Sequence, residues 1–323
     1  MFAKSRFMVP VLALVLTTLA CNIAMQGGNS QPTLPAQPTL DATRIMLEAQ
    51  ATALAAALAQ QPTTAPTVAA SATAPATETT APAAPPTETS IPEPTTVDMD
   101  ALIQNANILV YEDAGSVYLD TWVKSSLDLM GLKYTHVGDA LGDFMTNLNS
   151  STKWDLIIVA AESRRGVQGE FWDIIVPKVN NEKTALIVEM WYLSNIANGR
   201  IKSLTDACGI AFQSTRGLVE SIYLLDSSSP IFSTPNGGFS LTNYVGYWKD
   251  KGGDYVRTTS SDAVLLAGGF ASEKSRYGMI TSCFEGRAII QTFSSHDYKR
   301  ADMVKLWQNY ITNTLTNHFQ ALP

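Results

Sequence analysis

Aromatic residues are missing from most of the first third of this 323-residue chain, since none occurs between Phe7 and Tyr111. Prolines are concentrated in the same part, where residues 32–94 hold eleven of the sixteen. A segment rich in proline, threonine and alanine but without aromatics cannot bury enough apolar surface to offset the entropy lost on ordering. Residues 22–96 are therefore predicted to be a disordered linker, and residues 97–323 to be the folded domain.

Other residue types are scarce, and each scarcity excludes a class of function. The chain has three histidines, spread along the sequence, so a three-histidine metal site is not expected. Its net charge is −7 and it has no basic run, which excludes the footprint of a nucleic-acid-binding protein. No glycine pair has the setting of a phosphate loop. We therefore expect no cofactor and no nucleic-acid partner.

The N-terminus has the features of an export signal. An apolar run, Phe7–Leu19, follows two basic residues and is too short for a comfortable membrane span. Ala20-Cys21 then resembles the processing site of bacterial lipoproteins, although Thr18 stands where that site usually has an aliphatic residue. On that resemblance, residues 1–21 are predicted to be a lipoprotein signal peptide and Cys21 to be lipidated. Ordinary secretion with a free Cys21 is the alternative.

A lipid at Cys21 and a semi-stiff linker after it would hold the domain at the cell membrane, facing an extracytoplasmic compartment. The membrane, contacted through the lipid anchor, is thus the first predicted partner. Oxidising compartments permit disulfides, so the two cysteines of the folded part, Cys208 and Cys283, could pair. Two buried free thiols are the interpretation favoured here.

Short apolar runs alternate with amphipathic stretches through the first half of the domain. The runs of strand type are residues 107–111, 133–137, 154–160 and 185–188. Segments with helical spacing of apolar residues follow these runs. The alternation predicts an α/β domain built on a doubly wound, mostly parallel sheet.

The pattern changes after Cys208. Residues 227–254 are rich in glycine, proline, serine and asparagine and are predicted to form loops. Residues 263–267 have strand character, and residues 277–293 resemble a hairpin that turns at Glu285-Gly286. An amphipathic segment near the C-terminus predicts a closing helix.

The central turn follows Ala185–Val188, a run that suits a strand buried on both faces. Glu189 ends this run, and Trp191 and Tyr192 come directly after it. A carboxylate here is expected to be hydrogen-bonded by backbone N–H groups of the next helix, because an isolated buried charge is too costly. Trp191 is predicted to be either a core residue or an apolar platform for a ligand.

The C-terminal residues 285–296, with the helix that follows, resemble the end of class I glutamine amidotransferase-like domains, most closely the trehalose-utilisation type. The resemblance covers about residues 106–317 and implies a flavodoxin-like fold. Active members carry a nucleophilic cysteine after the central strand, whereas this chain has Glu189 and Trp191 there. Without a thiolate, glutaminase chemistry has no nucleophile. The resemblance therefore implies the fold and not the activity.

Parallel strands bring their carboxyl ends to one edge of a sheet, where ligands bind. The residues expected at this edge, and so in a ligand-binding site, are Glu112, Asp113, Glu162, Arg164, Glu189, Trp191 and His296. We favour a non-catalytic domain that binds a saccharide-like ligand or a partner protein. The alternative is a hydrolase in which Glu162 and Glu189 act as acid and base, with His296 as a further catalytic candidate. A purely structural role for the same residues is the third interpretation.

Overall fold

A computed structural model describes residues 98–323, apart from residues 115–118, 164–167, 219–220, 243 and 250. Cys21, the predicted linker and Arg164 therefore lie outside the described residues. No helix in the described part of the chain is long and apolar enough to cross a lipid bilayer.

Five strands form the parallel part of the sheet, in the order β2-β1-β3-β4-β10. They are β1 (Ile108–Glu112), β2 (Thr135–His136), β3 (Leu156–Ala160), β4 (Ala185–Glu189) and β10 (Ala288–Gln291). Every residue of β1, β3, β4 and β10 is buried. Their apolar runs are continuous rather than alternating because helices cover both faces of the sheet.

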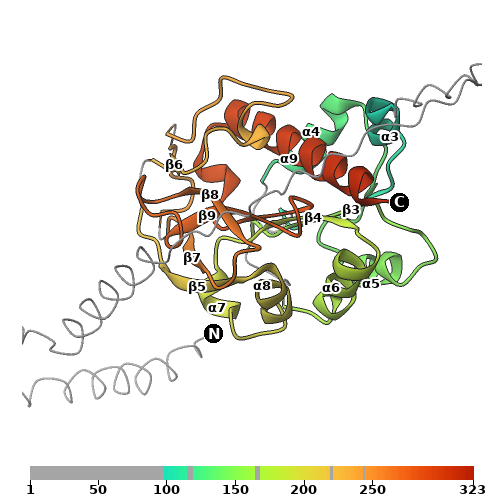
Figure 1. Cartoon of the computed structure of the whole chain (residues 1–323), viewed down its shortest axis with the longest axis horizontal. Coiled ribbons are helices and arrows are strands. Elements are labelled where there is room, and N and C mark those ends of the chain that lie inside the picture. Colours follow the sequence, from blue (N-terminus) through green and yellow to red (C-terminus); the bar gives the residue numbers. More distant parts are fainter. Residues whose placement is uncertain (1–97, 115–118, 164–167, 219–220, 243, 250) are drawn as a thin grey trace, which may run out of the picture. The chain divides into compact units, whose positions relative to one another are not determined.

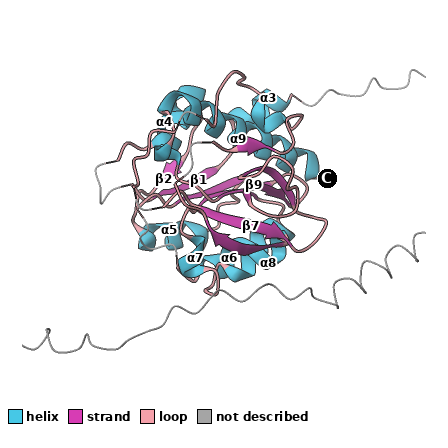
Figure 2. Ribbon diagram, turned by 90° about the vertical axis from the view of Figure 1, so that its left-hand side faces the viewer, coloured by secondary structure: helices cyan, strands magenta, loops and turns pink. Residues whose placement is uncertain are grey.

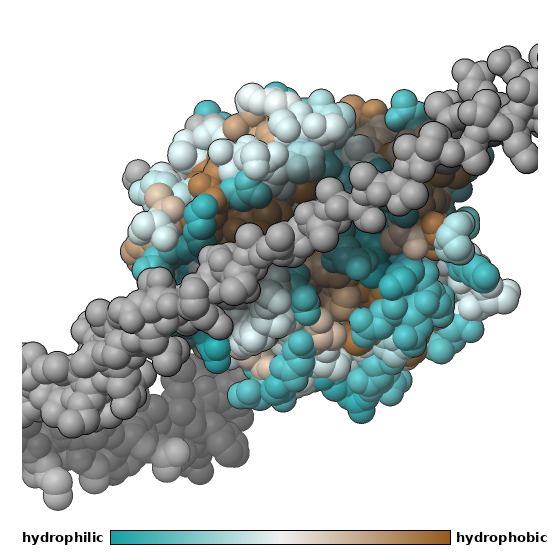
Figure 3. All heavy atoms as spheres, in the orientation of Figure 1, coloured by the Kyte–Doolittle hydropathy of each residue, from teal (hydrophilic) through white to brown (hydrophobic). Residues whose placement is uncertain are grey.

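Helices pack on both faces of the sheet, as Figures 1 and 2 show. One face holds α3 (Met99–Gln104), α4 (Trp122–Met130) and the long closing helix α9 (Arg300–Ala321). The other face holds α5 (Leu141–Leu148), α6 (Phe171–Asn181), α7 (Leu193–Ile196) and α8 (Lys202–Cys208). Hydrophilic residues predominate where the outer sides of α5 and α6 face solvent (Figure 3). The predicted doubly wound, flavodoxin-like α/β fold is confirmed.

Antiparallel strands extend the sheet beyond β10. The predicted hairpin is confirmed as β9 (Gly278–Cys283) paired with β10, and the predicted strand at 263–267 is β8 (Val264–Gly268). Sequence reasoning missed three strands: β5 (Ile210–Thr215), β6 (Tyr223–Leu224) and β7 (Asp254–Thr258). Residues 227–254 are mostly irregular, as predicted, with one short 3₁₀ helix, η1 (Pro230–Phe232). The missed strands are short and only partly apolar, so their pairing depends on the neighbouring strands.

A disulfide joins Cys208, at the end of α8, to Cys283, at the end of β9. The prediction of two free thiols is therefore wrong. The two residues are 75 positions apart, and their Cα atoms lie 5.4 Å from each other. Both side chains are buried in the core beneath α8, so tertiary packing brings them together where sequence spacing could not indicate it.

Replacing both cysteines, in the variant Cys208→Ala/Cys283→Ala, is expected to lower the free energy of unfolding by about 4 kcal/mol. The disulfide closes a loop of 75 residues, and such a loop restricts the unfolded chain by roughly that amount. Urea denaturation of the full chain measures the change. Cys21→Ala is the control and should leave the midpoint unchanged. A double variant as stable as the wild type would contradict the prediction.

Candidate functional site

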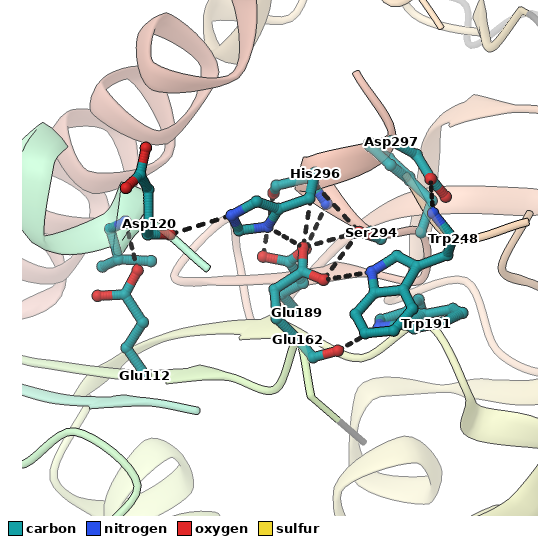
Figure 4. Close-up of polar contacts among 12 residues, drawn as sticks. Glu112, Asp120, Glu162, Glu189, Trp191, Trp248, Ser294, His296 and Asp297 are labelled. Atoms are coloured by element: carbon teal, nitrogen blue, oxygen red, sulfur yellow. Dashed lines mark hydrogen bonds and ion pairs between the residues drawn. The ribbon is translucent and has the colours of Figure 1, made fainter. Parts of the chain in front are cut away.

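The carboxyl ends of the central strands carry three glutamates. Glu112 ends β1 and Glu189 ends β4, and both are level with Ala160 at the end of β3. Glu162 follows β3 by two residues. The 3₁₀ helix η2 (Ser295–Asp297), four residues after β10, brings His296 to the same edge. Figure 4 shows Glu162, Glu189, Ser294 and His296 converging there, with Glu112 to one side.

Glu189 is buried and hydrogen-bonded, but not by the helix that follows it. One carboxylate oxygen accepts a hydrogen bond from the backbone N–H of Ser295 (2.6 Å), and the other accepts from the Ser295 hydroxyl (3.0 Å). The prediction that Glu189 caps the next helix is therefore wrong. That helix, α7, has only four residues, whereas the turn after β10 places two donors directly opposite the end of β4.

Glu162 is equally enclosed. The Ser294 hydroxyl lies 2.8 Å from each of its carboxylate oxygens, and the backbone N–H of His296 donates to Oε1 (3.1 Å). Trp248 donates from its indole Nε1 to Oε2 (3.1 Å). His296 Nδ1 lies 2.8 Å from Oε1 in an ion-pair contact without the alignment of a good hydrogen bond. Enclosed by these groups, the Glu162 side chain is almost inaccessible to solvent.

Glu162 and Glu189 interact with each other, and each shifts the pKa of the other. Burial, the Glu162 charge and the hydrogen bond from Glu189 to Glu162 raise the pKa of Glu189 well above its usual value. Burial alone would also raise the pKa of Glu162, but His296, Glu189 and Ser294 outweigh it and lower this pKa. The pKa values of these two carboxyl groups are therefore moved apart, that of Glu189 upward and that of Glu162 downward.

His296 balances the charge of Glu162. Burial lowers the pKa of His296, but the contact with Glu162 and the Asp120 carbonyl more than offset this, so the net shift is upward. Its Nε2 lies 3.0 Å from the Asp120 carbonyl oxygen, an arrangement that suits a protonated ring. The Trp122 ring stacks on it with centroids 4.0 Å apart. The His296 ring is thus enclosed and only 7% exposed.

The remaining predicted site residues do not join this cluster. Glu112 accepts from the backbone N–H groups of Val123 (2.8 Å) and Lys124 (3.1 Å), so it stabilises the start of α4. Asp113 is buried, and its backbone ties the end of β1 to the end of β3. Arg164 lies outside the described residues.

Trp191 is a core residue and not a ligand platform. Its side chain is fully buried, and its indole Nε1 donates to the Glu162 backbone carbonyl (3.0 Å). Tyr192, next to it, is also buried. The core interpretation of Trp191 is confirmed, and the platform interpretation is wrong for both residues. The aromatic that reaches the carboxylates instead is Trp248, whose ring centroid lies 4.9 Å from that of Trp191.

Sequence reasoning missed the segment that covers the cluster, residues 244–249. The Asp297 carbonyl accepts from the N–H groups of Val245 (2.7 Å) and Gly246 (3.3 Å), and its Oδ1 accepts from the Trp248 N–H (2.8 Å). Burial, together with the nearby Glu162 charge, raises the pKa of Asp297 to about 7. The only signal in the sequence was two tyrosines and a tryptophan within a stretch otherwise typical of loops.

Among the described residues, the edge holds neither a cluster of metal ligands nor a free thiol. The described residues contain no group of three or more histidine, cysteine, aspartate or glutamate side chains that could hold a metal ion. The position after β4 is Glu189-Met190-Trp191, and both cysteines of the described residues are joined in the disulfide. No thiolate is therefore available where the resembled amidotransferases have their nucleophile.

Comparison with known proteins found a similar solved structure but no similar sequence family. No protein-family model and no curated protein sequence matches the chain. Among solved structures it is similar to a Thermoplasma acidophilum protein described as a GMP synthase subunit, of the glutamine amidotransferase-like kind. The identity is 9% and the TM-score 0.38, over 67% of this chain and 96% of that one. Similarity at this level transfers no function to the chain.

The free energy of unfolding is expected to fall as the pH rises from 5.5 to 8. The raised pKa values of Glu189, His296 and Asp297 mean that the folded domain holds protons which the unfolded chain releases. Glu162, whose pKa is lowered, acts in the opposite sense, but only below its unfolded value of 4.5. Asp297 contributes about 1–2 kcal/mol of this fall, allowing for solvent screening.

Urea denaturation of the full chain at several pH values tests this dependence. Asp297→Asn keeps an acceptor for the Trp248 N–H but cannot ionise, so its stability should vary less between pH 5.5 and 8. The exposed Asp262→Asn is the matched control and should follow the wild type. An Asp297→Asn profile parallel to that of the wild type would contradict the assignment.

Proposed function

We propose that the chain is a membrane-anchored extracytoplasmic domain that binds a small, saccharide-like ligand or a partner protein without catalysing a reaction. On this proposal Cys21 carries the lipid and residues 22–96 are a disordered spacer. On this proposal the domain is similar to the trehalose-utilisation type of amidotransferase-like protein but lacks the nucleophilic cysteine. Neither a cofactor nor a nucleic acid is required.

The observation that carries the proposal is the enclosed carboxylate pair. Ser294, Ser295 and Trp248 donate hydrogen bonds to these two carboxyl groups. Acid and base catalysts act on a substrate or water placed between or beside them. Both side chains have almost no exposed surface, which disfavours such a placement in this arrangement. The two carboxyl groups are better suited to a structural role, in which they join the ends of β3 and β4 to the turn after β10, than to acid and base catalysis.

The disulfide supports the extracytoplasmic part of the proposal. Structural disulfides persist in secreted and periplasmic proteins and are rare in reducing compartments. A chain exported by the predicted signal of residues 1–21 would form the bond between Cys208 and Cys283 after export. Lipid anchoring and export are thus consistent with the chemistry of the folded part.

Lipidation of Cys21 is tested by metabolic labelling with radioactive palmitate in a bacterial host. The full chain should incorporate label and partition with membranes, and Cys21→Ala should do neither. Cys208→Ala is the control, because that residue lies in the folded part and its loss should leave labelling unchanged. Equal labelling of wild type and Cys21→Ala would refute the anchor.

A hydrolase that uses Glu162 and Glu189 is the alternative, and one observation favours it. The two groups have pKa values pushed in opposite directions, as acid and base pairs in enzymes do. Such a hydrolase would have to open the edge, because Trp248 and the two serines occupy the carboxylates in the closed arrangement.

Turnover of 4-nitrophenyl glycosides by the full chain separates the two functions. We expect the same background rate from the wild type, Glu162→Gln and Glu189→Gln, because no step depends on these carboxylates. The variants are matched in size and keep a hydrogen-bond acceptor at each position. A wild-type rate at least tenfold above both variants, with all three proteins folded, would establish the hydrolase instead.

A further inference from the structure

Four hydrogen bonds from the segment 244–249, which covers the carboxylate cluster, end on Asp297 or Glu162. Two of them run from consecutive backbone N–H groups to the Asp297 carbonyl (2.7 and 3.3 Å). The backbone N–H of Trp248 donates to Asp297 Oδ1 (2.8 Å), and its indole donates to Glu162 Oε2 (3.1 Å). Figure 4 shows Trp248 joined to both carboxyl groups. The position of the segment therefore depends on two ionisable residues.

The segment buries little apolar surface of its own. Tyr244 and Trp248 contact aromatic rings of the domain, whereas Val245 and Tyr247 face solvent with 55% and 46% of their surface exposed. Its backbone is irregular apart from one bridge, between Tyr244 and Tyr298. Segments with few buried apolar contacts and no ladder of backbone hydrogen bonds open at a lower free energy than the core. We therefore expect this segment to open before the strands beneath it.

Asp297, which accepts three of the four hydrogen bonds, is poorly placed to carry a charge. Its side chain is 1% exposed, and its Oδ2 has no hydrogen-bond partner among the described residues. Titratable and charged groups face it from several elements, and they are Glu162 after β3, Arg216 after β5, the adjacent His296 and Tyr298, and Tyr244 of the segment itself. Only two of these, Arg216 and a protonated His296, would favour a negative charge on Asp297.

Ionisation of Asp297 opposes the closed arrangement. Burial raises its pKa to about 7, and the neighbouring Glu162 charge adds to this rise. The Trp248 N–H group, Arg216 and His296 act in the opposite direction without cancelling it. A buried carboxylate oxygen without a donor is costly, so the closed arrangement favours the protonated form. When the segment opens, water reaches the carboxyl group and its pKa returns towards 3.8, so the open fraction rises with pH.

We propose that the segment 244–249 is a pH-sensitive lid, which opens locally when Asp297 loses its proton and so uncovers Glu162 and His296 at the strand ends. The lid is held at mildly acidic pH and released as the pH rises through about 7. Folds of this class bind ligands at this edge of the sheet. That the open lid admits a ligand rests on the proposed binding function, and apparent affinity would then rise with the open fraction.

Hydrogen–deuterium exchange of the full chain in detergent micelles, read by mass spectrometry, measures the opening without a ligand. The backbone N–H groups of Val245, Gly246 and Trp248 are the reporters, because each donates to Asp297 in the closed arrangement. After correction for the intrinsic exchange rate, their protection should fall roughly tenfold or more between pH 5.5 and 8. Urea well below the unfolding midpoint should leave this exchange unchanged, because local opening exposes little surface.

Three variants provide the controls. Asp297→Asn keeps an acceptor but cannot ionise, so it should lose most of the change in protection between pH 5.5 and 8. Asp262→Asn removes an exposed carboxyl group and should follow the wild type. Trp248→Phe removes the indole donor to Glu162, so protection should fall about tenfold at every pH while its pH dependence remains.

The outcomes separate the lid from the proposed function. The N–H groups of Leu186 and Met190, bonded to the strand β10 and the residue before it, report global unfolding. If the segment is as protected as these two groups and responds equally to urea, it opens only with the whole domain, and the lid is overturned. An Asp297→Asn profile parallel to the wild type overturns Asp297 as the trigger. Either result leaves the binding function standing, and failure to find a ligand leaves the lid standing.

Discussion

The burial of two neighbouring carboxyl groups, Glu162 and Glu189, is the constraint on which the edge of the sheet depends. Glu189 ends β4 and Glu162 follows β3, and two adjacent buried charges would be prohibitively costly. Burial and the neighbouring Glu162 therefore raise the pKa of Glu189, whereas the contact with His296 lowers the pKa of Glu162. The turn after β10 follows from this requirement, because its serines and backbone N–H groups supply the donors.

The same constraint reaches the surface through Trp248. Its indole satisfies Glu162 and its backbone satisfies Asp297, so an irregular segment of the chain is fixed over the strand ends without secondary structure of its own. The exposed Tyr247 owes its position to this attachment. The buried network thus determines where the surface ring lies. Glu162 and Asp297 hold Trp248 in place, and Tyr247 is the residue before it. This arrangement is consistent with the binding function that we propose.

The edge where folds of this class place ligands is present here in architecture but differs in chemistry. The position after β4 holds a buried carboxylic acid and a buried tryptophan, and the two cysteines of the folded part form a disulfide between α8 and β9. The disulfide is consistent with the extracytoplasmic location that we propose, because such bonds persist in oxidising compartments.

The sequence by itself determined the layers of this protein: the buried strands β1, β3 and β4, the hairpin β9–β10 and the closing helix α9. These depend on local periodicity and on runs of apolar residues, which are visible in a short window. Tertiary structure alone decided the site. Ser295 lies 106 residues from Glu189, Trp248 lies 86 from Glu162, and the disulfide spans 75. Partners so far apart meet only because the topology brings them together, and a buried carboxylate takes whichever donor the fold places within reach.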